Sequence, residues 1–572
     1  MPLPLILIKE GDFEMKQLSQ EILNTYKLWK EDKRFDEATR LELGADLSNE
    51  EIEDRFWRDL EFGTGGLRGV MGAGTNRMNK YIIRKATQGF ANYLLDKYGA
   101  EVKRGVAIGY DSRNNSDTFA KEAALVMAKS GIPAFLYDEL MPTPTLSFTV
   151  RELNCVGGIV VTASHNPREY NGYKVYDETG CQVLIDDANA IIGYVNAITD
   201  IPAIEVMDEN EARACGLLKS VPNEVYESFI ANVKKQAHDI GEKSAKIVYT
   251  PLHGTGNKPV RRVLSDLGYN VTVVKEQEEK NGDFPTVVSP NPENAEALSI
   301  GIKLCREQNA DLILGTDPDC DRVGIAVNTK DGMKLFTGNQ VGALLVDYVI
   351  KMNKAKLNEK STVIKTIVTS ELGAIIAKMN GLKVCEVLTG FKFIGDIMNQ
   401  FDTKGNGEFV IGYEESYGYL VGNHARDKDA VVASMLICEM ASYYKNQGKT
   451  LVDVMEEIYA KYGYFLDKLD SYTLKGIDGV ERIQAIMKEM REKGKSLMPN
   501  IAVVNDYTVG IGDLPKADVL KFVFEDSSWI AIRPSGTEPK IKVYYSVKGE
   551  NKAEAEMVLK ARQDIINSII NA

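Results

Sequence analysis

Strand-like apolar runs alternate with amphipathic helical patterns over most of this 572-residue chain, and this alternation restricts its fold more than any other feature. The run Gly105–Gly109 precedes a helical pattern over Ser116–Lys129, and Lys246–Thr250 precedes one that begins near Asn257. A strand pattern followed by a helical period is typical of βα units, in which helices cover the faces of a sheet. The sequence therefore predicts α/β layers.

The unit recurs along the chain, with further helices predicted at Asn294–Gln308 and Glu371–Met379, and changes only near the end. At roughly 150 residues per domain, a chain of this length is expected to hold about four domains. In the last hundred residues, short strands at Trp529–Arg533 and Ile541–Ser546 lie among predicted helices at Gly479–Lys493 and Lys552–Ile570, which indicates an α+β domain. We predict domains at residues 1–205, 206–331, 332–462 and 463–572. A polar helix is expected from about Lys16, and the first 14 residues are interpreted either as native chain or as an extension.

Charge and cysteine content exclude several classes of protein. Lys and Arg total 69 against 82 Asp and Glu, so the net charge of −13 has the wrong sign for coating nucleic acid or an anionic membrane. The seven cysteines include no Cys-x-x-Cys pair, which argues against a zinc knuckle and a disulfide framework. No apolar run approaches the roughly 18 residues of a membrane span. We expect a soluble cytoplasmic protein without nucleic-acid or membrane partners.

A first chemical loop, Thr162-Ala-Ser-His-Asn-Pro167, follows the apolar run Gly157–Val161. A strand ending in hydroxyl residues and an Asn-Pro turn presents a side chain at the carboxyl edge of a sheet, where α/β proteins bind ligands. Ser164 is the candidate nucleophile or phosphate carrier, with His165 and Lys174 as charge or proton partners. The alternative is a plain Asn-Pro turn between two strands.

A second loop, Gly315-Thr-Asp-Pro-Asp-Cys-Asp-Arg322, places three carboxylates at alternate positions after an apolar strand. We expect them on one side of an extended loop, where their repulsion would be relieved by a bound divalent cation. Oxygen-only ligands favour Mg²⁺, and the absence of the central Gly and of a bidentate Glu further on argues against an EF-hand. The adjacent Arg322 would let the same site hold a phosphate, and the alternative is a solvated acidic turn.

Two further loops suit a phosphorylated sugar. In Gly412-Tyr-Glu-Glu-Ser-Tyr-Gly-Tyr419, a carboxylate lies two positions before a hydroxyl, an arrangement suited to adjacent sugar hydroxyls; alone this signal is weak. In Arg533-Pro-Ser-Gly-Thr-Glu-Pro-Lys540, Arg, hydroxyls and a Gly with free backbone amides match the donors that a phosphate dianion needs. The alternative is a Pro-Gly turn that carries charge.

Together, in this order and spacing, the four loops resemble the α-D-phosphohexomutase superfamily, specifically the phosphoglucomutase type. The match runs from Gly63-Thr-Gly-Gly-Leu-Arg-Gly69 to Lys540. The resemblance implies three similar α/β mixed-sheet domains plus a smaller α+β C-terminal domain around a central cleft, with one functional loop from each domain.

The resemblance also implies roles for individual residues. Ser164 corresponds to the phosphoserine, and Asp317, Asp319 and Asp321 to ligands of one Mg²⁺, with the serine phosphate as a further ligand. Glu414 and Ser416 correspond to groups that hold sugar hydroxyls. The family's cradle for the non-reacting phosphate corresponds to Arg533, Ser535, Gly536 and Thr537, with added charge from Lys428 and Lys540. Other cleft positions are matched by Arg68, His165, Lys174, Arg322 and Thr389. Lys174 is our first choice for the general acid or base, and His424 the second.

In the implied reaction, a phosphoryl group moves from Ser164 to a free hydroxyl of the substrate and a bisphosphate forms. The bisphosphate reorients inside a closable cleft and returns its other phosphate to Ser164. We expect interconversion of glucose 1-phosphate and glucose 6-phosphate, with glucose 1,6-bisphosphate as activator and intermediate, in a monomer or homodimer. Tyr413, Tyr417 and Tyr419 depart from the usual surroundings of the sugar loop. Phosphopentomutase and phosphomannomutase activities therefore remain alternatives, and a catalytically silent phosphosugar sensor is a further one.

Overall fold

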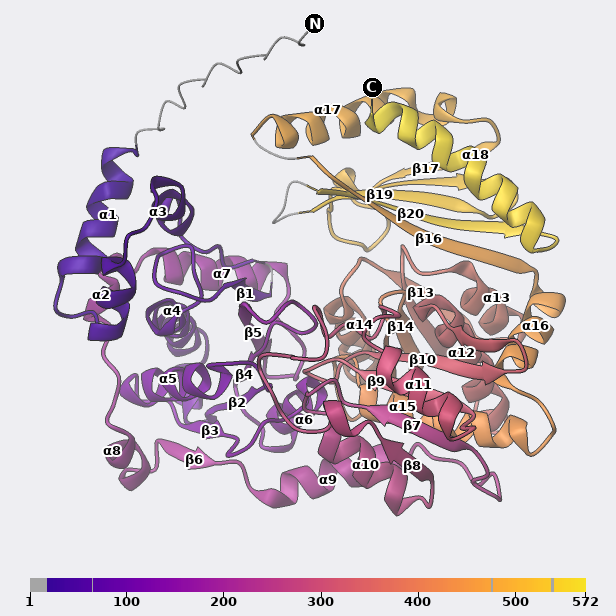
Figure 1. Ribbon diagram of the computed structural model, residues 1–572, viewed down its shortest axis with the longest axis horizontal. Coiled ribbons are helices and arrows are strands. Elements are labelled where there is room, and N and C mark those ends of the chain that lie inside the picture. The colour runs from indigo at the N-terminus through magenta and orange to yellow at the C-terminus, as the bar shows by residue number, and fades with distance from the viewer. Residues whose placement is uncertain (1–17, 64, 475–476, 536–539, 572) are drawn as a thin grey trace, which may run out of the picture.

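The computed structural model describes residues 18–571, except for 64, 475–476 and 536–539, and the statements below concern this part of the chain. Within it the strands form four separate sheets with helices packed around them (Figure 1). The predicted α/β architecture with an α+β domain at the end is confirmed. None of the described helices is both long enough and apolar enough to cross a membrane.

The first sheet has the strand order β1-β5-β4-β2-β3-β6 and follows three short helices. Its strands are β1 (Gly66–Val70), β2 (Val106–Tyr110), β3 (Ala134–Leu136), β4 (Gly157–Val161), β5 (Tyr170–Asp177) and β6 (Leu218–Ser220). The helices are α1 (Gln20–Glu31), α2 (Glu37–Gly44), α3 (Asn49–Phe56), α4 (Lys80–Tyr98), α5 (Ser116–Lys129), α6 (Thr143–Glu152), α7 (Ile185–Asn196) and α8 (Glu209–Ala214). Strands β2 and β4 are parallel neighbours, so the loops that follow them meet at one edge. Because β6 pairs with β3, this sheet continues past the expected boundary at residue 205.

The second sheet has the order β11-β10-β9-β7-β8. Its strands are β7 (Lys246–Thr250), β8 (Asn270–Val273), β9 (Leu312–Thr316), β10 (Val323–Thr329) and β11 (Gly332–Leu335), and its helices are α9 (Asn223–Lys234), α10 (Asn257–Asp266) and α11 (Ser299–Glu307). The antiparallel pair β9–β10 places residues 317–322 in the connecting turn. Helix α11 begins five residues later than the predicted Asn294, because residues 291–297 form turns closed by hydrogen bonds from Asn294 N to Asn291 O and from Ala297 N to Asn294 O.

The third sheet has the order β13-β12-β14-β15. Its strands are β12 (Ser361–Thr366), β13 (Lys383–Val387), β14 (Glu408–Glu414) and β15 (Gly418–Val421), and its helices are α12 (Gly338–Asn353), α13 (Glu371–Met379), α14 (Phe391–Lys404), α15 (Ala430–Lys445) and α16 (Leu451–Tyr462). Helix α15 is buried along most of its length, and it packs with residues of the second and third sheets in one continuous apolar core. These two sheets therefore form a firmly joined base for the site.

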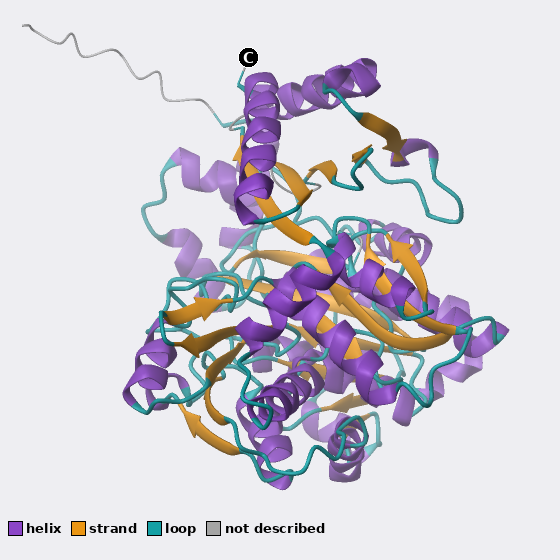
Figure 2. Cartoon of the chain, turned by 90° about the vertical axis from the view of Figure 1, so that its right-hand side faces the viewer, coloured by secondary structure: helices purple, strands orange, loops and turns teal. Residues whose placement is uncertain are grey.

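The fourth sheet is antiparallel throughout, with the order β16-β20-β19-β18-β17. Its strands are β16 (Tyr464–Thr473), β17 (Ile501–Asp506), β18 (Leu520–Phe524), β19 (Trp529–Pro534) and β20 (Lys540–Gly549), and its helices are α17 (Ile477–Lys493) and α18 (Lys552–Ile570). Both helices lie on the side of the sheet that faces away from the rest of the chain (Figure 1), and a view from the side again places this domain above the others (Figure 2). Ile367, Val368 and Leu388 pack against Trp529 and Tyr544, which anchors the domain on the third sheet.

Candidate active site

Ser164 lies just beyond the carboxyl end of β4 in an unusual backbone conformation. Its φ is +51° and its side chain is buried, with a residue exposure of 3%. The Ser164 hydroxyl donates a hydrogen bond to Asp317 Oδ2 at 2.7 Å. Ser164 Oγ also lies 3.1 Å from Nδ1 of His165. A positive φ costs a non-glycine residue about 1–2 kcal/mol. Neighbouring contacts must therefore hold Ser164 in the orientation that faces the aspartates.

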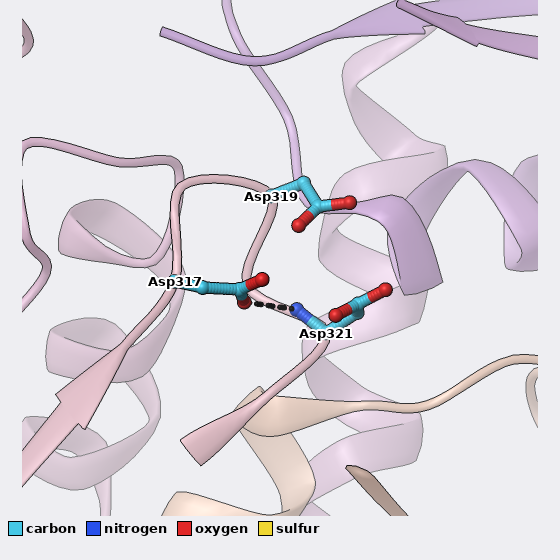
Figure 3. A group of neighbouring side chains, drawn as sticks. All are labelled: Asp317, Asp319 and Asp321. Atoms are coloured by element: carbon cyan, nitrogen blue, oxygen red, sulfur yellow. Dashed lines mark hydrogen bonds between the residues drawn. The ribbon is translucent and has the colours of Figure 1, made fainter. Parts of the chain in front are cut away.

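The three aspartates of the β9–β10 turn converge, although the turn is not extended as the sequence suggested. Backbone N–H groups of Asp321 and Arg322 donate to Asp317 Oδ1 at 3.1 and 3.0 Å, and Cys320 has a φ of +52°. The chain thus folds back around the Asp317 carboxylate, and Asp319 reaches the same space (Figure 3). One oxygen of each carboxylate lies within 4.8 Å of those of the other two. A compact turn, rather than alternation along an extended chain, brings the charges together.

The donor set of this cluster fits a hard divalent cation. Oδ1 of Asp319 and Oδ1 of Asp321 are buried without a hydrogen-bond partner among the described residues. Burial and the two neighbouring carboxylates raise the pKa of Asp317 well above its usual value. Buried unpaired carboxylate oxygens are costly, and a cation with oxygen ligands such as Mg²⁺ would satisfy them.

Two lysines pair with the cluster and neutralise part of its charge. Lys174 Nζ lies 2.7 Å from Asp319 Oδ2 and 3.3 Å from Asp321 Oδ2. Lys428 Nζ lies 3.2 Å from Asp321 Oδ2 and 3.1 Å from Asp427 Oδ1. Lys174 comes from β5 and Lys428 from the segment after β15, so three of the four sheets contribute charged groups to one point.

Arginines line the approach to Ser164. Arg68 of β1 donates to Asn166 Oδ1 at 3.3 Å, and Arg322 is paired with Glu293 at 2.7 Å. Burial, reinforced by these two guanidinium groups, lowers the pKa of His165 well below its usual value. The imidazole beside Ser164 is therefore neutral near pH 7.

Two adjoining cavities open onto these groups and form one cleft. The larger, of about 690 Å³, lies between all four sheets, and the smaller, of about 270 Å³, includes Ser164. The expected site residues on the larger cavity are Arg68, His165, Arg322, Thr389, Glu414, Ser416, Lys428 and Arg533. Those on the smaller cavity are Arg68, Ser164, Lys174, Asp321, Arg322 and Lys428. A cleft of this size, lined by cations, suits an anionic small molecule.

The sugar-type loop follows β14, and only part of it faces the cleft. Glu414 and Ser416 line the larger cavity, and Glu414 Oε1 accepts a hydrogen bond from Gly390 N at 3.0 Å. Tyr413 and Tyr419 are buried in the core behind the loop, with exposures of 0% and 1%, whereas Tyr417 lines the cleft. Of the three tyrosines that set this loop apart, Tyr417 therefore has access to a ligand in the cleft.

The phosphate-type loop joins β19 and β20. Arg533, at the end of β19, lines the larger cavity, and Ser535 N donates to Lys540 O at 2.8 Å. Gly536 and Thr537 lie outside the described residues. Lys542 of β20 pairs in register with Arg533 and lines the same cavity, so this face of the fourth sheet carries a second cation that the sequence analysis missed.

Several cleft residues were missed and one candidate lies elsewhere. The missed residues that line the cleft include Gln182, Asn291, Glu293, Lys542 and Tyr544. Most lie on segments without a recognisable motif. Lys542 is different, because it lies between the apolar residues Ile541 and Val543 on a predicted strand. Successive side chains of a strand point to opposite faces, so this alternation could have placed Lys542 on the face opposite to its two neighbours. The prediction of His424 as second choice for the general acid or base is wrong. Its Nε2 lies 2.7 Å from Asp429 Oδ2 in a buried pair, and His424 is not among the described residues that line either cavity. It is unsuited to act as the general acid or base.

Comparisons with known proteins agree with this arrangement of fold and site. Models of the phosphoglucomutase/phosphomannomutase family match residues 59–201 with alpha/beta/alpha domain I, 224–332 with domain II, 337–462 with domain III and 474–562 with the C-terminal domain. The chain is 38% identical over 541 residues to a phosphoglucomutase of Staphylococcus saprophyticus, covering 91% of this chain and 96% of the relative. It is also 38% identical to a Staphylococcus aureus phosphoglucomutase, covering 87% and 92%.

Solved structures show the same fold. The parafusin phosphoglucomutase of Paramecium in its open form has a TM-score of 0.69 at 19% identity, covering 90% of this chain and 96% of that one. A phosphomannomutase-like protein of Thermus thermophilus has a TM-score of 0.64 at 22% identity, covering 88% and 99%. Fold and site together define an enzyme of the phosphohexomutase class. The chain belongs to the phosphoglucomutase/phosphomannomutase family.

A pH effect on stability is expected from Glu415, which lies in the sugar-type loop between Glu414 and Ser416. Burial, followed by the neighbouring Glu414, raises its pKa to about 7, from an unfolded value near 4.5. Because the pKa of Glu415 is higher in the folded than in the unfolded state, the protonated carboxyl group stabilises the fold fully below pH 4.5. This contribution is lost as the pH rises through 7, which lowers the free energy of unfolding by up to about 3 kcal/mol.

Glu415→Gln should remove this loss. The difference in melting temperature between the variant and the wild type is expected to move in the variant's favour by a few degrees between pH 5 and pH 8. Differential scanning calorimetry at both pH values measures it, and a gap that stays constant with pH would contradict the assignment.

Proposed function

We propose that the chain interconverts α-D-glucose 1-phosphate and glucose 6-phosphate through a phosphorylated Ser164 and glucose 1,6-bisphosphate. The observation that carries this proposal is the 2.7 Å contact between Ser164 Oγ and Asp317 Oδ2, in a buried acidic cluster that opens onto a cation-lined cleft. The choice of glucose rests on the relatives at 36–38% identity, which are named phosphoglucomutases.

We propose Asp317, Asp319, Asp321 and the Ser164 phosphate as ligands of one Mg²⁺. The unpaired buried oxygens of the cluster support this choice, and a related fungal N-acetylphosphoglucosamine mutase with a TM-score of 0.51 was solved with GlcNAc-6P and magnesium. When bound, the ion would supply positive charge to the phosphoryl group in transfer.

The chain's own residues perform the remaining work. Arg322 and Arg68 lie where they can hold the oxygens of the moving phosphoryl group, since both line the two cavities. Lys174 is our candidate for the general acid or base because its Nζ lies between the aspartates and the smaller cavity. Glu414 and Ser416 are proposed to hold sugar hydroxyls at the far side of the cleft. After the first transfer, the bisphosphate must turn so that each phosphate in succession faces Ser164.

The phosphate that does not react is proposed to bind at Arg533, Ser535, Gly536, Thr537 and Lys540, with Lys428 adding charge. Ser535→Ala should raise KM for glucose 1-phosphate by about tenfold, the effect of one lost hydrogen bond to a charged group, and change kcat by less than about threefold. Steady-state kinetics measure both constants. A fall in kcat at constant KM would place Ser535 elsewhere in the mechanism.

The substrate is tested by assaying the purified enzyme with glucose 1-phosphate, ribose 1-phosphate and mannose 1-phosphate in the presence of Mg²⁺ and a priming bisphosphate. We expect the highest kcat/KM with glucose 1-phosphate. A glucose value a hundredfold below the ribose value would favour a phosphopentomutase, a higher mannose value would favour a phosphomannomutase, and the absence of turnover with all three would leave a phosphosugar sensor.

A further inference from the structure

Arg113 is a buried cation that packs against the Ser164 loop, and no role has been given to it in the site described above. It belongs to the segment after β2, and its side chain has an exposure of 0%. The guanidinium donates to the backbone carbonyl oxygens of Ser164 at 2.6 Å, Pro167 at 2.8 Å and Tyr170 at 3.1 Å, and also to that of Asn166. One side chain thus holds four carbonyl groups of a single loop.

The arrangement requires arginine in particular. A guanidinium presents five N–H donors in a rigid planar fork, whereas the ammonium of lysine is a compact group on a flexible stem. A buried carbonyl group that loses its donor is left without a hydrogen bond, which is destabilising. Arg113 is not among the described residues that line the two cavities. Its guanidinium group therefore contacts the loop and is out of reach of a ligand in the cleft.

A second set of hydrogen bonds holds the other side of Ser164. The Thr162 hydroxyl donates to Asp111 Oδ2 at 2.6 Å and accepts from Ser164 N at 2.8 Å. Asp111 can only accept, since its carboxylate is also paired with Arg113 and receives the Arg113 backbone N–H at 2.9 Å. The proton of the Thr162 hydroxyl is therefore committed to Asp111, which leaves its lone pairs for the Ser164 amide.

Both peptide groups that flank Ser164 are consequently fixed: the amide N–H by Thr162 and the carbonyl by Arg113. The φ of Ser164 lies between them at +51°, a conformation that needs external support. This backbone orientation aims Oγ at Asp317. We propose that Arg113 and Asp111, acting through Thr162, are positioning residues that hold Ser164 in its strained conformation for phosphoryl transfer. The proposal rests on the proposed function in one respect, the role of Ser164 as phosphoryl carrier.

The sharpest test replaces Thr162 by valine, which has the same shape and lacks the hydroxyl. Displacing a nucleophile by about 1 Å can cost about 100-fold in rate, so kcat is expected to fall about 100-fold. KM for glucose 1-phosphate should change by less than about threefold, because the residues that line the cleft are untouched. Thr162→Ser keeps the hydroxyl and should recover most of the lost kcat.

Thr149→Val is the matched control. Thr149 is a fully buried threonine in α6 of the same domain, and its hydroxyl donates to Thr145 O at 2.7 Å, away from the loop. Its substitution should lower the melting temperature to a similar extent and leave kcat unchanged. A merely structural role of Thr162 would make the two variants alike.

Arg113→Lys tests the hydrogen bonds from Arg113 to the carbonyl groups of the loop. Hydrogen exchange is the readout, because it does not depend on turnover. Amide exchange in residues 162–170, followed by mass spectrometry, should accelerate at least tenfold in Arg113→Lys and in Thr162→Val, and stay unchanged in Thr149→Val. If Arg113→Lys does not fold, the Thr162 variants decide alone.

The proposal is overturned if Thr162→Val retains wild-type kcat, or if its loss appears in KM, or if exchange in the loop is unchanged. An inactive wild-type enzyme would instead refute the proposed function, while the exchange measurements would still decide whether Arg113 and Asp111 hold the loop.

Discussion

Ser164→Ala should lose mutase turnover almost completely, with kcat falling by about four orders of magnitude or more. The hydroxyl is the acceptor and donor of the phosphoryl group in the proposed mechanism, and removing a covalent nucleophile leaves only the binding contributions to catalysis. Its Oγ lies 2.7 Å from Asp317 Oδ2 of the acidic cluster, and the substitution leaves that carboxylate without this donor. Coupled assays with glucose 1-phosphate measure the loss.

Intact-mass measurement gives a second readout for the same variant. The wild type, incubated with glucose 1,6-bisphosphate, should show a phosphate-sized mass increment that is missing in Ser164→Ala. Ser434→Ala is the matched control, because the Ser434 hydroxyl is buried in α15 without a hydrogen-bond partner among the described residues. It should keep both the increment and the activity. Normal turnover of Ser164→Ala would refute the mechanism.

The second large effect is expected from Asp319→Asn, which should weaken Mg²⁺ binding by two orders of magnitude or more. Affinity for a hard cation depends strongly on the number of charged oxygen ligands. The amide can still accept from Thr143 and Lys174, which now bond to Asp319 Oδ2 at 2.9 and 2.7 Å, so the turn should keep its fold. Mutase activity is expected to fall by about 1,000-fold, since charge stabilisation is lost at the phosphoryl group.

Metal binding to Asp319→Asn is measured by titration calorimetry and by thermal unfolding. For the wild type, Mg²⁺ at a hundredfold of its Kd should add about 2.7 kcal/mol of stability, and the variant should gain almost nothing at the same concentration. Asp331→Asn, an exposed aspartate in the β10–β11 turn of the same sheet, should behave as the wild type does. Unchanged Mg²⁺ affinity in Asp319→Asn would remove the cluster from consideration as the metal site.

Much of the secondary structure could be predicted because it depends on local patterns. The predicted bounds Ser116–Lys129, Glu371–Met379 and Lys552–Ile570 coincide with α5, α13 and α18, and Lys246–Thr250 with β7. Helix α13 begins after Ser370, whose side chain accepts from Leu372 N, a capping contact that is written in consecutive residues. Helix α11 was placed too early because turn-forming hydrogen bonds compete with helix in residues 291–297.

The candidate site could be predicted where a short motif carries the chemistry. Ser164 and Asp317 lie 153 residues apart in sequence, and each was found from its own loop, yet their contact at 2.7 Å follows only from how two domains pack. Asp111 and Arg113 were missed, although parallel pairing of β2 with β4 brings the segment after β2 beside the Ser164 loop. Their role depends on the backbone carbonyl groups of a distant loop, which Arg113 contacts only in the folded chain.

The α/β layers, the four candidate loops and the family could be predicted from the sequence alone, because periodicity and motif spacing are properties of neighbouring residues. The three-dimensional structure was needed to show that the three aspartates meet through a compact turn, that Tyr413 and Tyr419 belong to the core while Tyr417 faces the cleft, and that His424 is paired with Asp429. The physical reason is that burial, pairing and strain depend on segments far apart in the chain, and their energies are set by packing that no single stretch of sequence contains.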